Sequence, residues 1–131
     1  GITILDSDQL IINDGGTMVQ TAMTDLKAYV ELGFNPAINV ALKADGDTLN
    51  TGVNYFADMG SDGTDAVTLP ASPSVGQSVK VKAPSDCSAA RKITINRAGS
   101  QTIDGATLIT LESPFAAVEL VYVASDLWRV F

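Results

Sequence analysis

Apolar and polar residues alternate along much of the second half of the chain, with the two-residue period of half-buried β-strands. Valines alternate with lysines in residues 78–83, and isoleucines flank a threonine in residues 92–96. Turn signals recur about every 8–12 residues, a spacing typical of sandwiches and barrels. They separate further strand-like runs at residues 66–69, 101–103, 107–111, 117–124 and 127–131. We therefore predict an antiparallel β-sandwich or barrel over residues 64–131.

Large apolar side chains occupy both faces of the last two predicted strands, residues 117–124 and 127–131. Burying a Val, Leu or Phe side chain is worth roughly 1.5–3 kcal/mol. Leaving three or four of them in water would cost about as much as the whole stability of a small domain. Association between subunits would bury them, so the predicted interface includes Val121, Val123, Leu127 and Phe131.

The first 36 residues predict a small β-hairpin followed by a short α-helix. The turn Asn13-Asp14-Gly15-Gly16 contains the Asp-Gly and Gly-Gly pairs that tight hairpin turns favour, which places a hairpin over residues 9–20. Thr24 is a suitable N-cap for a helix that Gly33 can end. This element is too small to bury both its faces alone, so we expect it to dock on another surface. Its predicted contact residues are Ile2, Ile4, Leu10, Ile12, Tyr29, Leu32 and Phe34.

Residues 37–63 are interpreted as a connector with short strands at 38–42 and 53–57, separated by the polar turn Asp45-Gly46-Asp47. The predicted fold class is therefore mainly β. Three segments follow: a hairpin-helix docking element over residues 1–36, a connector over 37–63, and an antiparallel β domain over 64–131.

Composition argues against catalysis and against nucleic acid as a partner. The chain of 131 residues contains no histidine and a single cysteine, Cys87, so the commonest general base, an intrachain disulfide and a multi-cysteine metal site are all excluded. Its net charge of −7, with only 8 Lys and Arg residues, does not fit a phosphate backbone. No apolar run approaches the roughly 18 residues that span a bilayer, so we expect a soluble protein with no membrane partner and no cofactor.

Acidic residues offer candidate chemistry, but each candidate has a simpler interpretation. The pairs Asp6 with Asp8, Asp45 with Asp47, and Asp62 with Asp65 could ligate a hard cation. None of them completes a calcium loop, so a solvated turn is the favoured interpretation. Glu112 or Glu119 could serve a glycosidase, yet the aromatic lining of a sugar cleft is missing. We predict no catalytic and no metal-binding residues.

Trp128 admits two interpretations. An exposed Trp could stack on a glycan in a carbohydrate-binding module, whereas its place in a terminal apolar strand favours a role in the core. We predict a core residue and keep the lectin-like alternative open.

The second half of the chain resembles a module that recurs in structural proteins of tailed bacteriophages. The resemblance rests on an ordered series covering about half the chain and ending in a Trp strand. Its members are Val67-Thr68-Leu69-Pro70, Gly76-Gln77-Ser78-Val79-Lys80-Val81-Lys82, Ile93-Thr94-Ile95, Thr102-Ile103-Asp104-Gly105, Ile109-Thr110-Leu111, Val118-Glu119-Leu120-Val121 and Leu127-Trp128-Arg129-Val130. One departure is Ala124-Ser125-Asp126, which stands where the turn before the Trp strand often carries a glycine.

The start of the chain, residues 8–16 and 26–30, also resembles the small module that opens many phage fibre and head-decoration proteins. The resemblance implies a homotrimeric β protein that decorates the capsid by binding the major capsid protein or other virion proteins. It would be found on the capsid surface of the virion and in the host cytoplasm during assembly. The short chain favours a decoration (cement) protein; a tail fibre or spike, or a carbohydrate-binding adhesin module, is the alternative.

Overall fold

The computed structural model describes residues 9–14, 17–22, 38–61 and 63–131, and within these residues every helix or strand is a β-strand. The prediction of a mainly β protein is confirmed. The chain divides into two compact units, Gly1–Ala37 and Ile38–Phe131. The strands are β1 (Gln9–Asp14), β2 (Thr17–Ala22), β3 (Val40–Leu42), β4 (Gly52–Tyr55), β5 (Thr64–Thr68), β6 (Ser78–Lys82), β7 (Lys92–Asn96), β8 (Thr102–Ile103), β9 (Leu108–Leu111), β10 (Ala117–Ala124) and β11 (Leu127–Val130).

The first unit contains a two-stranded antiparallel sheet. β1 pairs with β2 in a register that runs from Gln9 opposite Ala22 to Asp14 opposite Thr17. The two glycines of the predicted turn and the predicted helix after Thr24 lie outside the described residues.

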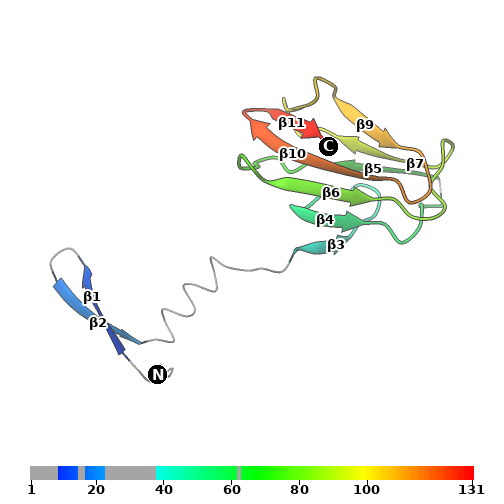
Figure 1. Cartoon of the computed structure of the whole chain (residues 1–131). Coiled ribbons are helices and arrows are strands. Elements are labelled where there is room, and N and C mark those ends of the chain that lie inside the picture. The colour runs from blue at the N-terminus through cyan, green and yellow to red at the C-terminus, as the bar shows by residue number, and fades with distance from the viewer. Residues whose placement is uncertain (1–8, 15–16, 23–37, 62) are drawn as a thin grey trace. The chain divides into compact units, whose positions relative to one another are not determined.

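The second unit consists of two sheets, which Figure 1 shows from one side. A six-stranded sheet has the order β3-β4-β6-β10-β11-β8, and a three-stranded sheet has the order β5-β7-β9. The alternation predicted in β6 is confirmed, because Val79 and Val81 are buried whereas Lys80 and Lys82 are exposed. The two valines of β6 therefore face the three-stranded sheet, and the two lysines face away from it.

The predicted all-antiparallel pairing is wrong, because both sheets are mixed. β3 with β4, β4 with β6, β5 with β7 and β8 with β11 are parallel pairs. The physical reason is that the chain leaves the six-stranded sheet between its parallel neighbours. Residues 47–49 bond to β5 between β3 and β4, and from β4 to β10 the chain alternates between the two sheets. A strand that returns to its own sheet after such a crossover can lie parallel to its neighbour, whereas a hairpin would force the antiparallel direction.

Part of the segment predicted as a connector belongs to the main sheet. β3 and β4, close to the predicted short strands at residues 38–42 and 53–57, pair with each other, and β4 pairs with β6. Gly52 makes the β3–β4 approach possible: its φ is +101°, and a Cβ added there would overlap the carbonyl oxygen of Asn39. The second compact unit therefore begins at Ile38, well before residue 64.

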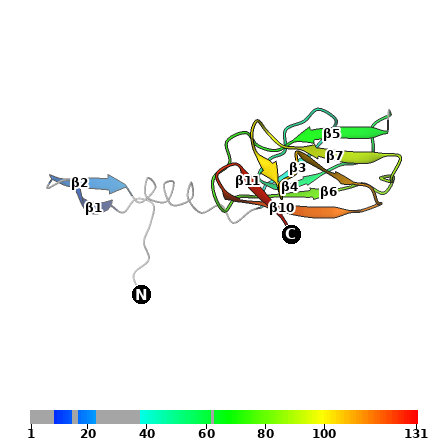
Figure 2. The same ribbon diagram turned by 90° about the horizontal axis from the view of Figure 1, so that it is seen from above.

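The core lies between the two sheets, which form the two layers visible in Figure 2. Strands of both sheets supply fully buried side chains to one cluster. Ile93 and Ile95 come from β7 of the three-stranded sheet, and Val79 and Leu120 come from the six-stranded sheet. The sequence-based choice between sandwich and barrel is thus resolved in favour of two packed sheets.

Candidate functional site

The last two strands, β10 and β11, sort their apolar side chains onto two faces. Tyr122 lies opposite Trp128, and Leu120 lies opposite Val130, in an antiparallel pairing with a bulge between Tyr122 and Ala124. Leu120, Tyr122 and Trp128 are buried in the core. Because side chains alternate across a strand, the residues between them face outward, away from the three-stranded sheet.

The outward row contains the four C-terminal residues predicted as interface, and we call Val121, Val123, Leu127 and Phe131 the association face. Val121 and Leu127 are half-buried, whereas 37% of Val123 and 75% of Phe131 remain exposed. Phe131 follows β11 and stays in register, because its N–H donates to the carbonyl oxygen of Glu119 at 2.9 Å. Strand alternation and pairing therefore bring the four residues to one side of the six-stranded sheet.

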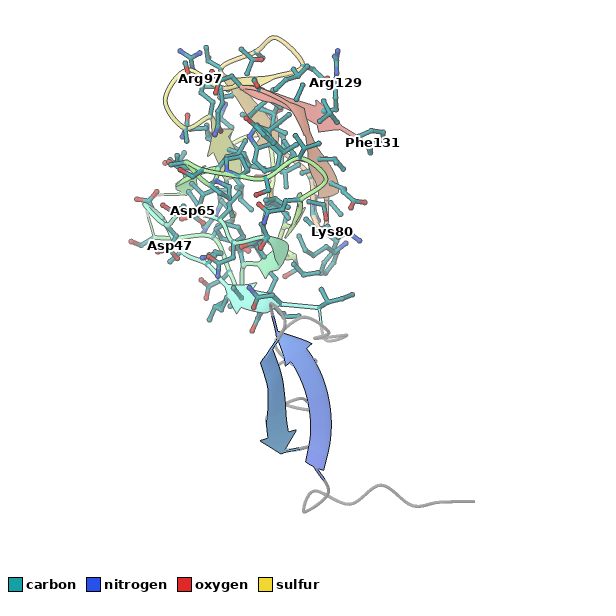
Figure 3. All side chains as sticks on the ribbon, turned by 90° about the vertical axis from the view of Figure 1, so that its left-hand side faces the viewer. Asp47, Asp65, Lys80, Arg97, Arg129 and Phe131 are labelled. Atoms are coloured by element: carbon teal, nitrogen blue, oxygen red, sulfur yellow. The ribbon has the colours of Figure 1, made fainter. Side chains whose placement is uncertain are left out.

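A groove of about 460 Å³ adjoins the association face, with Phe131 as one of its walls. Its lining comes from three neighbouring strands and includes Val53 of β4, Lys80 and Lys82 of β6, and Glu119 of β10. Figure 3 shows Lys80, Arg129 and Phe131 on one side of the sandwich, with Asp47 and Asp65 on the other. The groove combines apolar walls with a short row of cations.

The charges beside this groove interact with one another. Lys80 Nζ lies 3.7 Å from Glu119 Oε1, and both side chains are substantially exposed, so the pair is worth at most about 1 kcal/mol. The ammonium group of Lys82 donates to the carbonyl oxygen of Phe115 and lies 5.9 Å from the centroid of its ring. These contacts hold the two lysines along the groove without burying their charge.

Arg129 and Asp104 form an ion pair at the β8–β11 end of the sheet, with Nη1 3.0 Å from Oδ1. The side-chain hydrogen bond from Arg129, together with a backbone hydrogen bond from Val130, lowers the pKa of Asp104 below its ordinary value. The carboxylate thus links the turn after β8 to β11.

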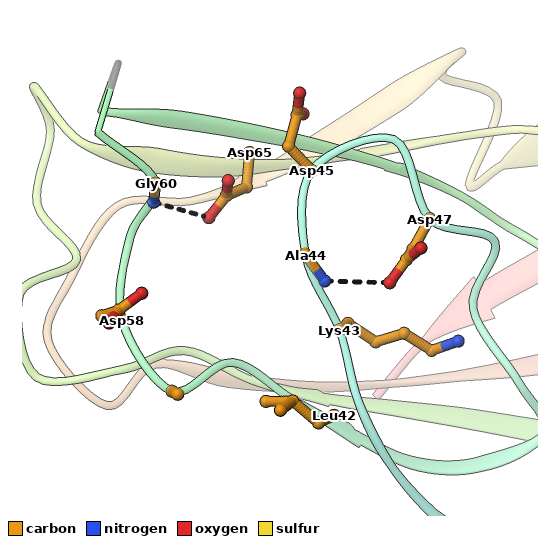
Figure 4. Close-up of a pocket in the computed structure, with 9 residues that line it drawn as sticks. Leu42, Lys43, Ala44, Asp45, Asp47, Asp58, Gly60 and Asp65 are labelled. Atoms are coloured by element: carbon orange, nitrogen blue, oxygen red, sulfur yellow. Dashed lines mark hydrogen bonds between the residues drawn. The ribbon is translucent and has the colours of Figure 1, made fainter.

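A second hollow, shown in Figure 4, is acidic and lies among the loops near β5. Its carboxylates accept backbone hydrogen bonds: Asp47 from Ala44 N at 2.9 Å, and Asp65 from Gly60 N at 3.4 Å. Asp45, at its rim, accepts one from Ala66 N at 2.7 Å. Among the described residues, no three acidic, Cys or His side chains converge to hold a metal ion. We assign these aspartates to loop structure; Asp6, Asp8 and Asp62 lie outside the described residues.

Trp128 is a core residue, which confirms that prediction. Its side chain is fully buried, its indole N–H donates to Gln101 Oε1 at 3.0 Å, and its ring meets Tyr122 edge to face at 5.2 Å. No face of the indole is free to stack on a glycan. Cys87 is buried as well, with its thiol 3.2 Å from the carbonyl oxygen of Leu111.

The remaining predicted contact residues belong to the first unit. Leu10 and Ile12 lie on β1, opposite Thr21 and Val19. The other five, which lie outside the described residues, are Ile2, Ile4, Tyr29, Leu32 and Phe34.

Sequence reasoning missed an exposed apolar row along β3. Ile38, Val40 and Leu42 are 65%, 60% and 57% exposed, and the row continues onto β4 at Tyr55, which is 40% exposed. The sequence signal for this row was the apolar alternation of Ile38, Val40 and Leu42, which is typical of a strand and not of a connector.

Comparison with models of known protein families and with curated proteins found no match to this sequence. In the part of the chain that the structure describes, no helix is long and apolar enough to cross a membrane.

Proposed function

We propose that this chain is a non-catalytic structural protein that works by binding copies of itself and other proteins, and that its copies meet at the association face. The observation that supports this most directly is the outward row of Val121, Val123, Leu127 and Phe131. Burial of Phe131 alone would recover roughly three quarters of the 1.5–3 kcal/mol that a fully buried side chain contributes. In a single subunit Phe131 stays in contact with water, so this stabilisation is not gained.

The assembly we propose is a homotrimer on the surface of a bacteriophage capsid. Its support is the resemblance of the ordered strand series, ending at Trp128, to tailed-phage structural modules. The partner would be the major capsid protein, bound through the docking element of residues 1–36. Each trimer would clamp neighbouring capsid subunits, and the many equivalent sites on a shell would multiply a modest contact into a large stabilisation.

A matched pair of substitutions tests the association face. Val123 and Leu108 are similarly exposed, at 37% and 43%, but lie on different sheets. We expect Val123→Asp to convert the trimer to monomers at micromolar concentration, because a carboxylate would be desolvated at the contact, whereas Leu108→Asp leaves the trimer intact. Sedimentation velocity measures both. Equal behaviour of the two variants would move the contact elsewhere.

Capsid attachment is tested by adding purified chain to empty capsids and sedimenting the mixture. We expect the full chain to pellet with the shells, and a chain lacking residues 1–33 to remain trimeric in the supernatant. Retained binding by the shortened chain would locate the attachment surface in residues 34–131. Failure of the full chain to bind any capsid preparation, combined with binding to cells, would instead favour an adhesin.

A further inference from the structure

We propose that the exposed edge of β3 pairs with β3 of a second copy of this chain, in antiparallel fashion across a two-fold axis at Ala41. The surface differs from the association face, and the pairing would join two trimers edge to edge. The proposal rests on two features of the same three residues, Val40–Leu42: an open strand edge and side chains that are all apolar.

The backbone of β3 has its hydrogen-bonding groups divided between two sides. The carbonyl oxygen of Asn39 accepts from Val53 N at 2.7 Å, and Lys43 N donates to the carbonyl oxygen of Tyr55 at 2.9 Å. Alternate residues of a parallel pair bond to the same neighbour, so Ala41 also faces β4. The N–H and C=O groups of Val40 and Leu42 therefore point the other way, where the six-stranded sheet has no further strand among the described residues.

Two of the other three sheet edges are closed by the chain itself. At β8, Ile103 exchanges hydrogen bonds with Ala106, with N···O distances of 2.9 and 2.8 Å. At β5, Ala66 O accepts from Gly46 N at 2.8 Å, and Thr68 exchanges bonds with residues 47–49. Folded proteins cover or charge their edges in this way because an open edge invites pairing with another chain.

The edge at β9 is bordered by charged residues at its C-terminal end. Thr110 donates its hydroxyl hydrogen to Glu112 at 3.2 Å, and Glu112 lies 3.7 Å from Lys92 Nζ. β3 has no charged residue within it, and its exposed side chains are Val40 and Leu42, at 60% and 57%. The edge strand β3 therefore exposes two large apolar side chains beside open backbone groups, whereas β9 exposes one, Leu108, at 43%.

A second copy of β3 fits this edge in one full register. With Ala41 opposite Ala41 of the partner, Val40 lies opposite Leu42 in both directions, and every outward N–H and C=O group of Val40 and Leu42 is paired. The two apolar rows then meet on the same face of one continuous sheet. The antiparallel direction also keeps the positive charge of Lys43 beside Asn39 of the partner subunit, and away from the other Lys43. A parallel pairing in register would place the two lysines together.

The subunit count separates this proposal from the association face. The face alone gives a trimer and the β3 edge alone gives a dimer. Both together give a closed hexamer when the two-fold axes intersect the three-fold axis, and neither gives a monomer. Native mass measurement of the full chain reads these outcomes directly. An even number supports the β3 pairing; a trimer overturns it and leaves the proposed function standing; a monomer overturns both.

A charge placed in the edge should halve the mass. We compare Leu42→Lys with Leu108→Lys, because both residues are exposed leucines on edge strands, at 57% and 43%. Leu42→Lys should convert the even-numbered assembly to half its mass, and Leu108→Lys should leave it unchanged. An unchanged mass in Leu42→Lys, or an equal loss in both variants, would overturn the pairing.

Cysteine cross-linking tests the register. Non-hydrogen-bonded antiparallel partners have Cα atoms about 4.5 Å apart, within the disulfide range. Ala41→Cys should therefore form a covalent dimer under mild oxidation, visible on a non-reducing gel. Asn39→Cys is the control, because its symmetry mate would lie about 13 Å away, beyond the reach of a disulfide. No dimer from Ala41→Cys, or equal dimer from both variants, would exclude this register.

Discussion

Gly52 offers a sharp test of how the sheet holds its edge strand. Its φ is +101°, a conformation that costs an L-residue about 1–2 kcal/mol. An added Cβ would also overlap the carbonyl oxygen of Asn39 and lie 3.1 Å from Asn39 Cβ. Relief of that overlap would displace the carbonyl that accepts from Val53 N, a hydrogen bond worth about 0.5–1.5 kcal/mol net. We expect Gly52→Ala to lower the free energy of unfolding by about 1.5–3.5 kcal/mol.

Gly76→Ala is the matched control, because Gly76 has a φ of +90° and no atom within 4 Å of an added Cβ. It should show the backbone strain alone. The difference between the two variants isolates the overlap with Asn39, and for a domain of this size each additional 1 kcal/mol lowers Tm by about 4–8 °C.

Urea unfolding of the two variants supplies the free energies, and amide hydrogen exchange locates the damage. Exchange in Gly52→Ala should rise selectively at Ala41 and Lys43, whose N–H groups face β4. If Gly52→Ala proves no more destabilising than Gly76→Ala, β3 does not pack against β4 as described, and the β3 edge loses its structural basis.

Three further predictions concern single side chains. Trp128→Phe removes the donor to Gln101 inside the core, so it should cost about 2–4 kcal/mol in chemical denaturation, and a loss below about 0.5 kcal/mol would contradict the buried hydrogen bond. The lowered pKa of Asp104 means that its contribution to stability is present above the ordinary value of 3.8 and is lost as pH falls through the lowered value. Asp104→Asn should therefore reduce Tm slightly at pH 7 and flatten the decline of Tm below pH 4; identical profiles for the two proteins would refute this. Cys87 should resist thiol reagents until the chain unfolds, because its side chain is fully buried, and rapid labelling of native protein would show a more open loop.

Strands such as β6 and β7 were predictable because every second side chain is buried in the core. Val79 and Val81 face the core while Lys80 and Lys82 face solvent, and sequence alternation reports that directly. The assignment of each strand to one of the two sheets was not predictable in the same way. A turn such as Asp104-Gly105 reverses the chain equally well within a sheet or between sheets, so local signals do not separate hairpins from crossovers.

The outward placement of Val121, Val123, Leu127 and Phe131 was predictable, because apolar residues occupy both faces of β10 and β11 and only one face of the sheet meets the core. Association of copies at this surface stays a prediction. The β3 edge was not predicted, because the short strand expected at residues 38–42 was assigned to a connector and its partner β4 lies beyond an intervening loop. Asn54 was also unexpected: it is fully buried and satisfied by Asn50 and Lys80, as its amide donates to their carbonyl oxygens at 2.8 and 3.2 Å. Such a polar core residue depends on loop geometry that the sequence alone does not reveal.

A dilution series tests whether this chain functions through association of its own copies. Native mass measurement of the unmodified chain, from about 50 μM down to about 0.5 μM, spans the range in which a specific contact worth about 10 kcal/mol would persist. We predict that assemblies built from trimers remain the main species throughout. A chain that stays monomeric across the whole range would show that it does not work by binding copies of itself.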